Sequence, residues 1–277
     1  MNKNIAILLL LSILSFNLTG QDLKLMSYNI KYDNKRDTVN NWIDRKESLI
    51  RLIRHYEPSF IGTQEALHHQ VKYIDSCLVD FAFIGVGRDD GRQAGEYTAI
   101  HYDSTLYKVL DSNTFWLSES PEKVSVGWDA AMERICTYGL FENLKTKEQF
   151  YVFNTHFDHI GEKAREQSAN LILQRIKKIN DQNLAVVLMG DFNLRPEEKP
   201  IQQIRSKMKD GKDITERLFY GPEGTFNGFD QNMALDHRID YIFITKFKVK
   251  FYVHIDDRMD NNKHISDHLP VLIGVEK

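Results

Sequence analysis

Acidic, amide and histidine side chains stand at the ends of short apolar runs in this sequence, where the chain would leave a β-strand. Ligand sites of layered α/β proteins gather at strand ends, because the following loops carry side chains into a shared cleft. A single Asn or Asp at such a place more often makes a turn or caps a helix. The prediction of a site therefore depends on several such ends occurring in one chain. The residues concerned are Asn29, Glu65, His156, Asp158, Asp191, Asn193, Asp240, Asp267 and His268.

The chemistry that these side chains offer is oxygen ligation together with proton transfer. Carboxylate and amide oxygens select hard divalent cations, so we expect Mg²⁺ as the cofactor, with Mn²⁺ as a plausible substitute. Zn²⁺ is less favoured, because the sequence has no Cys/His cluster with the spacing of a zinc site. The cysteines Cys77 and Cys136 could pair in an oxidising compartment, but they make no disulfide framework, and we expect buried free thiols.

The elements that would position these residues are short strands and a few helices. Apolar runs of strand length, bounded by polar or turn residues, cover residues 23–28, 59–63, 81–86, 97–102, 138–144, 150–155, 185–189, 239–245, 248–255 and 269–275. Helical spacing of apolar residues predicts helices over 41–55, 67–78 and 162–179. Strand–helix–strand order at the start and near 150–190, beside runs that look antiparallel, favours mixed sheets covered by helices over a purely parallel sheet.

Length and composition are those of an ordinary globular protein. The chain has 277 residues, of which 42% are hydrophobic and 27% charged. With a formal net charge of −3 it lacks the basic excess of a protein that wraps nucleic acid, so long duplex DNA is not favoured as a partner. No repeat or Pro/Gly-rich linker divides the chain after residue 21, which predicts one domain over residues 21–277.

The N-terminal residues have the pattern of an export signal. Lys3 precedes an almost wholly apolar run over residues 5–16, and a polar stretch then ends at Gly20. The run is too short to span a bilayer comfortably, so we expect a signal peptide over residues 1–20 and a secreted or periplasmic protein. Because Leu18 stands where a small residue is preferred before cleavage, an uncleaved anchor is the alternative. We expect no membrane span in the mature chain, which has no second long apolar segment.

Six short motifs contain most of the candidate site residues and follow one another along the chain. They are Met-Ser-Tyr-Asn-Ile at 26–30, Gly-Thr-Gln-Glu at 62–65, Asn-Thr-His-Phe-Asp-His at 154–159, Gly-Asp-Phe-Asn at 190–193, Arg-Ile-Asp-Tyr-Ile at 238–242 and Ser-Asp-His-Leu-Pro at 266–270. In this order they resemble the endonuclease/exonuclease/phosphatase superfamily, which includes DNase I-like nucleases, inositol polyphosphate phosphatases and neutral sphingomyelinases. The resemblance runs from about residue 23 to 275. It implies an α/β fold of the DNase I-like type, a four-layer sandwich of two packed mixed β-sheets flanked by helices.

The resemblance also implies a metal-dependent phosphoesterase, which hydrolyses a P–O bond by direct attack of an activated water. Such an enzyme must neutralise the charge on the phosphoryl oxygens, align and activate the water, and stabilise the leaving oxygen. By resemblance, Glu65 holds the metal that polarises the phosphate, with Asn29 and Asp267 beside it.

The other motif residues are expected to transfer protons and to contact the substrate. Asp191 would accept or orient the proton of the attacking water, with Asn193 positioning water or phosphate; Asp191 could instead bind a second metal. His268 would act on the scissile phosphate or in proton transfer, and Asp240 would fix its tautomer and support its positive charge. His156 would donate a hydrogen bond to a phosphoryl oxygen.

Several further features each have two interpretations. Glu96 is a candidate to orient His156, and Arg134 either contacts the substrate phosphate or forms a surface ion pair. Asp158 and His159 belong either to the site or to a turn at the strand end. The aromatic residues between 114 and 130 either form a wall or lid over the substrate or pack into the core.

The substrate is restricted mainly by what the sequence lacks. Residues 236–240, Asp-His-Arg-Ile-Asp, differ from the Trp-Cys-Asp-Arg-Ile element of the inositol phosphatases, which speaks against inositol polyphosphates. The substrates that remain are a nucleotide, a nucleic acid or a sugar phosphate. We expect the enzyme to act as a monomer. One alternative is a phospholipase C-like sphingomyelinase acting on a lipid headgroup, although the sequence has no long apolar hairpin for membrane insertion. A binding protein that keeps the fold without catalysis is the other alternative.

Overall fold

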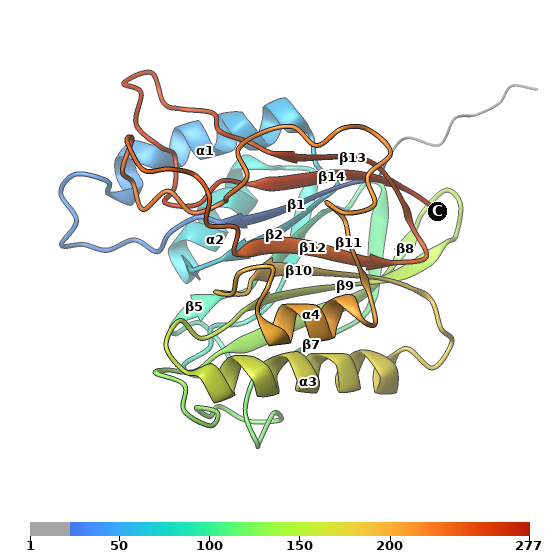
Figure 1. The fold of residues 1–277 in the computed structure, drawn as a ribbon. Coiled ribbons are helices and arrows are strands. Elements are labelled where there is room, and N and C mark those ends of the chain that lie inside the picture. The colour runs from blue at the N-terminus through green and yellow to red at the C-terminus, as the bar shows by residue number, and fades with distance from the viewer. Residues whose placement is uncertain (1–22) are drawn as a thin grey trace, which may run out of the picture.

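Two six-stranded β-sheets form the centre of the protein in this computed structural model, which describes residues 23–277 (Figure 1). The predicted signal peptide lies outside the described residues. The first sheet has the order β13 (Lys248–His254), β14 (Val271–Glu276), β1 (Leu23–Asn29), β2 (Phe60–Gln64), β6 (Ile100–Asp103) and β4 (Phe81–Ile84). The second has the order β11 (Lys209–Asp210), β12 (Asp240–Thr245), β10 (Ala185–Asp191), β9 (Gln149–His156), β8 (Ile135–Asn143) and β7 (Tyr107–Trp116).

Helices cover the outer face of each sheet, so that the fold has the four layers predicted from the sequence (Figure 1). Helices α1 (Trp42–Tyr56) and α2 (His68–Cys77) pack on the first sheet, and α3 (Glu162–Ile179) and α4 (Lys199–Arg205) pack on the second. A third apolar cluster fills the space between the sheets. Side chains alternate between these clusters: Leu25 faces the other sheet, and its neighbour Met26 faces the helices.

Both sheets are mixed, because each contains one parallel pair joined through a helix. Strands β1 and β2 are parallel and are connected by α1, while β9 and β10 are parallel and are connected by α3. The other pairs are antiparallel. A parallel pair brings the carboxyl ends of its two strands to the same edge, so the loops after β1, β2, β9 and β10 leave together.

Helix α1 shows how local sequence fixes an element close to the site. Asn41 precedes the helix, and its side chain accepts a hydrogen bond from the backbone N–H of Asp44, as a helix N-cap does. The helix ends at Tyr56, and the next residue, Glu57, adopts the left-handed conformation common after a helix. Its buried face includes Leu49 and Ile53, which pack against the first sheet.

The predicted strand at 97–102 is divided in the structure. Glu96–Tyr97 (β5) pairs with Ala66–Leu67 (β3) in a separate two-stranded sheet, whereas β6 belongs to the first sheet. Ala99 lies between β5 and β6, where the predicted strand is interrupted. Its carbonyl accepts hydrogen bonds from the N–H of Thr63 and from the side chain of Asn154, and these bonds stabilise the packing at this point. The short helix α4 was not predicted.

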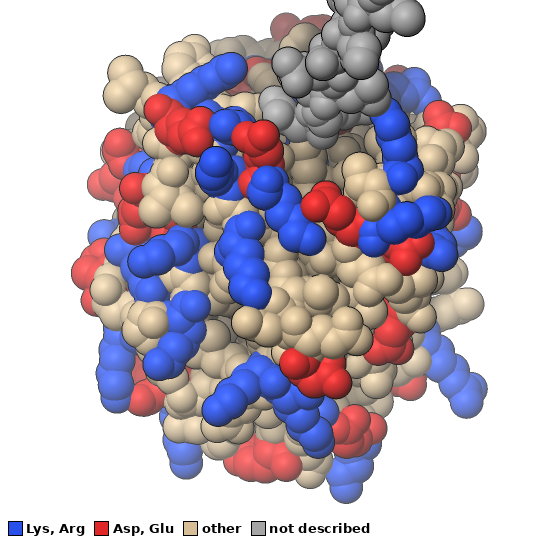
Figure 2. Space-filling view, turned by 90° about the vertical axis from the view of Figure 1, so that its right-hand side faces the viewer, with Lys and Arg blue, Asp and Glu red and all other residues tan. Residues whose placement is uncertain are grey.

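Strand β1 runs from one end of the domain to the other (Figure 1), beginning at Leu23 and ending at Asn29. On the face where β1 begins, Lys and Arg are interspersed with Asp and Glu (Figure 2). Cys77 is half-buried, Cys136 is buried, and the two are not bonded. Within residues 23–277 no helix is long and apolar enough to cross a membrane.

Candidate active site

The predicted site residues meet at one end of the two sheets because their strands end in register. In the second sheet Asp191 lies opposite His156 of β9 on one side and opposite Asp240 of β12 on the other. In the first sheet Asn29 at the end of β1 lies beside Gln64 at the end of β2. The pairing therefore places an imidazole, two carboxylates and two amides at the same edge, from five different strands.

Two buried amides fasten the two sheets together at this end. Gln64 Nε2 donates a hydrogen bond of 2.6 Å to Asn154 Oδ1, and Asn154 Nδ2 donates to the carbonyl oxygens of Thr63 and Ala99, each at 2.9 Å. Both side chains are fully buried. The sequence motifs contain Gln64 and Asn154, but their part in joining the sheets depends on which sheet each belongs to.

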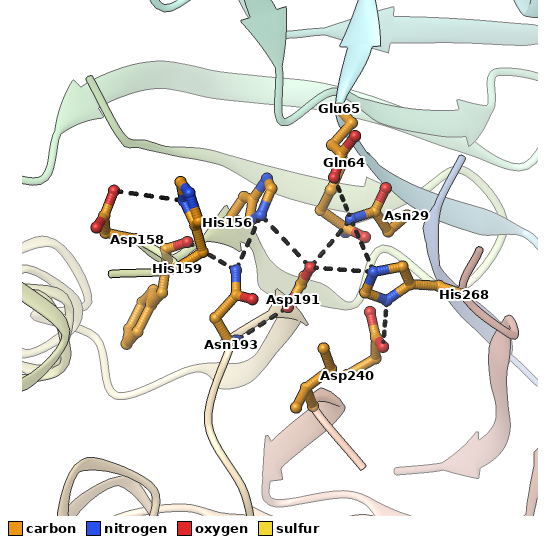
Figure 3. Close-up of polar contacts among 12 residues, drawn as sticks. Asn29, Gln64, Glu65, His156, Asp158, His159, Asp191, Asn193, Asp240 and His268 are labelled. Carbon is orange, nitrogen blue, oxygen red and sulfur yellow. Dashed lines mark hydrogen bonds and ion pairs between the residues drawn. The ribbon is translucent and has the colours of Figure 1, made fainter. Parts of the chain in front are cut away.

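A cavity of about 590 Å³ opens above these strand ends. The predicted residues that line it are Glu65, Arg134, His156, Asp191, Asn193, Asp267 and His268. Asn29 and Asp240 do not line it, but they hydrogen bond residues that do, and both are fully buried. The residues expected at the site thus lie in or directly beneath this cavity, and Figure 3 shows those around Asp191.

One corner of the cavity carries the residues expected to bind the metal. The Lys31 ammonium lies 3.2 Å from Glu65 Oε2 and 3.3 Å from Asp267 Oδ2, so the two carboxylates converge on one point. Asn29 Nδ2 donates to Glu65 Oε1 at 3.1 Å. Burial by itself would raise the pKa of Glu65, but Lys31, His268 and these hydrogen bonds together lower that pKa below its usual range. Hence the corner holds an ionised Glu65 beside the Asp267 carboxyl group, and oxygen ligands of this type are those that hard divalent cations prefer.

His268 is held between two carboxylates. Its Nδ1 lies 2.8 Å from Asp240 Oδ2, and its Nε2 lies 3.7 Å from Asp191 Oδ2. Thr225 Oγ1 donates to the same Asp240 oxygen at 2.5 Å, while it accepts the backbone N–H groups of Ile239 and Asp240. Burial alone would lower the pKa of His268, but the two carboxylates outweigh it and raise the pKa to about 10. The imidazole is therefore a proton donor at neutral pH.

Asp191 lies at the centre of the group, between the two histidines (Figure 3). Its Oδ2 is 3.0 Å from Asn29 Nδ2 and 3.4 Å from His156 Nε2, and its Oδ1 accepts the backbone N–H of Asn193 at 2.9 Å. Burial and the neighbouring Asp240 raise the pKa of Asp191 to about 7. A carboxyl group with this pKa is suited to accept a proton near neutral pH.

His156 lies on the other side of Asp191. Asn193 Nδ2 is 3.1 Å from His156 Nε2 and also donates to the carbonyl of Phe157 at 3.0 Å. Burial and the nearby guanidinium groups of Arg134 and Arg88 lower the pKa of His156, so this imidazole is neutral. It can therefore donate and accept hydrogen bonds without carrying charge, in contrast to the charged His268.

An arginine-rich wall closes the cavity beyond His156. Arg134 is 4% exposed, so it is no surface ion pair; it contacts Asp158 Oδ2 at 3.3 Å and His159 Nδ1 at 2.9 Å. Arg88 holds Glu96 with two hydrogen bonds of 2.7 and 3.0 Å, and Glu96 lies 3.9 Å from His156 Nδ1. Burial raises the pKa of Glu96 to about 7. Glu96 faces His156 as expected, but Arg88 is its main partner.

Asp158 and His159 have different positions. Asp158 is buried, accepts the backbone N–H groups of Ile160 and Gly161 just before α3, and does not line the cavity. His159 is half exposed at its side chain and lines the cavity beside Arg134. The turn interpretation therefore fits Asp158, which also pairs with Arg134, whereas His159 is accessible to a substrate.

The aromatic residues of the 114–130 stretch form no wall of this cavity. Phe115 and Trp116 are buried, so the core-packing interpretation holds for both. Trp116 Nε1 donates to the carbonyl of Arg88 at 2.8 Å, which helps to fix the segment that carries this arginine.

Some cavity residues were missed by the sequence analysis because they lie outside the strand-end motifs. Lys31 and Arg88 bring positive charge into the cavity, and Thr225 positions Asp240 from a loop. Buried Arg45 donates to the carbonyls of Ile30, Asn40, Lys31 and Ile265, and so ties the loop after β1 to the segment before Asp267. Lys31 directly follows the motif at 26–30, and this position was the one sequence signal that could have indicated it.

Comparison with known proteins identifies the family. Residues 26–268 match the family model described as the Endonuclease/Exonuclease/phosphatase family. The chain belongs to this family. Over 93% of its length it superposes on 99% of an endonuclease/exonuclease/phosphatase from Bacteroides vulgatus, with a TM-score of 0.88 and 40% identity. A mannosyl-6-phosphatase of Bacteroides thetaiotaomicron matches 92% of this chain with all of its own length, at a TM-score of 0.89 and 35% identity.

Two proteins of lower identity are also similar to this chain. The human Nocturnin catalytic domain is 17% identical, with a TM-score of 0.74 over 92% of this chain and 94% of its own. The Drosophila melanogaster protein angel is 24% identical over 208 residues, and this chain spans 56% of its length. As an endonuclease/exonuclease/phosphatase family member, the protein is a hydrolase of phosphoester bonds, and the cavity described above is its candidate active site.

Proposed function

We propose that this family member is a Mg²⁺-dependent phosphoesterase of small phosphate esters, with a sugar phosphate as the first candidate substrate. The observation that carries the proposal is the cavity of about 590 Å³, whose volume suits a small molecule and whose walls carry acidic groups at one side and Arg88 and Arg134 at the other. The 35% identity with a mannosyl-6-phosphatase over 92% of this chain supports the choice of substrate class.

The residues of the carboxylate corner fit a divalent cation. Glu65 and Asp267 already face a cation, the Lys31 ammonium, at 3.2 and 3.3 Å, so their geometry suits a shared positive charge. Asn29 remains our third ligand: its Oδ1 accepts the N–H of Lys31 and keeps a second lone pair. When bound there, Mg²⁺ would neutralise the charge on the phosphoryl oxygens.

Asp191 is our candidate for the group that takes the proton of the attacking water. Its central position and its pKa of about 7 support this role. Asn193 and the neutral His156 lie beside it and would donate hydrogen bonds to a phosphoryl oxygen, while Arg134 would hold the phosphate from the far wall.

His268 would donate a proton or a hydrogen bond at Nε2 to the scissile phosphate or to the leaving oxygen. Asp240 supports this role, because it binds Nδ1 at 2.8 Å and thereby leaves Nε2 directed toward Asp191 and the cavity. Asp191, Asp240 and His268 could also hold a second metal, since their ligand atoms lie within 4.8 Å of one another. The short His268–Asp240 bond favours the proton-transfer role.

The proposal is tested by activity profiling of the purified chain from residue 21. Sugar 6-phosphates, nucleoside monophosphates, an aryl phosphodiester, single-stranded DNA and sphingomyelin are incubated with Mg²⁺, with Mn²⁺ and with EDTA. We expect phosphate release from sugar phosphates that EDTA abolishes. Phosphocholine release from sphingomyelin would favour the lipid-directed alternative, and inactivity on every ester would favour a binding protein.

We also propose that the protein is exported and acts as a monomer outside the cytoplasm. The apolar run at residues 5–16 supports export. N-terminal sequencing of the protein from an extracytoplasmic fraction should begin near residue 21. An intact Met1 on a membrane-bound protein would favour the uncleaved anchor instead.

A further inference from the structure

Lys31 lines the cavity, and the proposed mechanism gives its side chain no role. It follows β1, and its ammonium lies between Glu65 Oε2 at 3.2 Å and Asp267 Oδ2 at 3.3 Å. The same ammonium lies 4.9 Å from the centre of the Tyr32 ring. Its side chain is 29% exposed and lines the cavity, so one cation is placed against both carboxylates that a metal would use.

The backbone of Lys31 is fixed in an unusual conformation. Its φ is 57°, in the left-handed region that residues other than glycine rarely adopt. The surrounding structure holds it there: its N–H donates to Asn29 Oδ1 at 3.1 Å, and its carbonyl accepts from Arg45 at 3.2 Å and from Gln70 at 3.0 Å. Such strain persists where neighbouring groups enforce it and is concentrated at functional sites.

The side chain of Lys31, by contrast, is able to move. Lysine carries its charge at the end of a flexible four-carbon stem, so the ammonium can leave the carboxylates while the backbone stays in place. A divalent cation at Glu65 and Asp267 would use the same oxygen atoms, and it would repel an ammonium that remained between them. The two cations therefore compete for one pair of ligands.

We propose that Lys31 is an internal competitor for the catalytic divalent cation, which sets the metal affinity of the site. The cation binds only as the ammonium is displaced from Glu65 and Asp267. The displaced ammonium stays within the cavity wall, where it adds positive charge toward the substrate phosphate. This inference rests on the metal dependence proposed above and names a residue that regulates it.

The decisive measurement is direct metal binding in the absence of substrate. Wild type, Lys31→Met and Lys31→Arg are stripped with EDTA, dialysed and titrated with Mn²⁺ and Mg²⁺ by isothermal titration calorimetry. Methionine keeps the length of the stem without its charge, so we expect Lys31→Met to bind the cation about tenfold more tightly or better, as loss of a charge-assisted contact implies. Lys31→Arg retains a cation and should bind within about threefold of wild type.

Matched variants separate this effect from general changes of charge. Lys35→Met removes an exposed lysine from the same loop and should leave the metal affinity unchanged. Glu65→Gln should abolish binding in both the wild-type and the Lys31→Met backgrounds. If Lys31→Met folds poorly, Lys31→Gln replaces it, and the rise in melting temperature on adding Mn²⁺ gives a second readout, which should be larger in the variant than in wild type.

The outcomes distinguish this inference from the proposed function. If wild type binds Mn²⁺ at a site that Glu65→Gln removes, but Lys31→Met binds with equal or lower affinity, Lys31 is no competitor and the inference is overturned. If wild type binds no divalent cation and its activity resists EDTA, the metal-dependent function itself fails. If Lys31→Met is the one lysine variant that binds Mn²⁺ more tightly than wild type, the result supports both the role of Lys31 and the metal-dependent function.

Discussion

Asp240→Asn tests whether the carboxylate behind His268 supports catalysis. The substitution keeps the shape of the side chain and removes its charge. Asp240 Oδ2 lies 2.8 Å from His268 Nδ1 and accepts the Thr225 hydroxyl at 2.5 Å. Because the Thr225 hydroxyl has its proton committed to this oxygen, the asparagine should place its carbonyl oxygen there and keep both hydrogen bonds.

The expected magnitude follows from the two carboxylates that face His268. With an effective dielectric constant of about 20, a charge pair at the 2.8 Å separation of Asp240 interacts by about 6 kcal/mol, and one at the 3.7 Å separation of Asp191 by about 4.5 kcal/mol. Removing the Asp240 charge therefore leaves less than half of the electrostatic interaction energy that stabilises the His268 imidazolium. If about half of the lost interaction is used in the transition state, the barrier rises by about 3 kcal/mol, which is roughly a hundredfold in kcat.

The assay is phosphate release from the best substrate under Mg²⁺, with kcat normalised to folded protein by circular dichroism. We expect Asp240→Asn to lose roughly a hundredfold in kcat with little change in melting temperature. Asp210→Asn is the control, because Asp210 is an equally buried carboxylate that pairs with Arg238 and Arg205 outside the cavity. It should lower the melting temperature and leave kcat unchanged. A kcat for Asp240→Asn within about fivefold of wild type would refute the role of the pair.

Three further variants test the role of His268 and two features of the stability of the fold. His268→Ala should lower turnover by at least about a hundredfold without unfolding the protein, and near-normal turnover would remove His268 from the mechanism. Gly190→Ala should lower the free energy of unfolding by about 3 kcal/mol in urea titrations, because Gly190 has φ 150° and a Cβ would lie 2.0 Å from the carbonyl oxygen of Thr155; an unchanged midpoint would contradict this. His101→Leu concerns pH: burial lowers the pKa of His101 to about 4, so between pH 6.5 and 4 the unfolded chain binds a proton that the folded chain refuses. Wild type should therefore lose up to about 3 kcal/mol of stability on acidification that His101→Leu retains, and equal losses in both proteins would show that His101 does not cause it.

Most of the fold could be predicted from local patterns. The helix over residues 162–179 was predicted with the bounds of α3, since its apolar stripe recurs at helical spacing. The alternation that places Leu25 and Met26 on opposite faces of β1 is also local. Local patterns failed where the pairing partners determine the bounds of a strand. The run 97–102 was predicted as one strand, but Glu96–Tyr97 and Ile100–Asp103 pair with different strands.

The sequence by itself determined the kinds of side chain at the site and their places at strand ends. That was sufficient to predict Glu65, Asp191 and His268 as one group, because ligand sites of layered α/β proteins gather at strand ends. The order of the motifs added the family, and with it the class of reaction.

Tertiary structure alone decided the electrostatics. The same residue type has opposite properties in His156 and His268, because the first is buried beside guanidinium groups and the second between two carboxylates. The lysine after β1 gained its importance in the same way, since only folding brings Glu65 and Asp267, far apart in the sequence, to within 3.3 Å of its ammonium. Charge interactions depend on distance in space and on burial, and neither quantity is encoded in the local pattern of the chain.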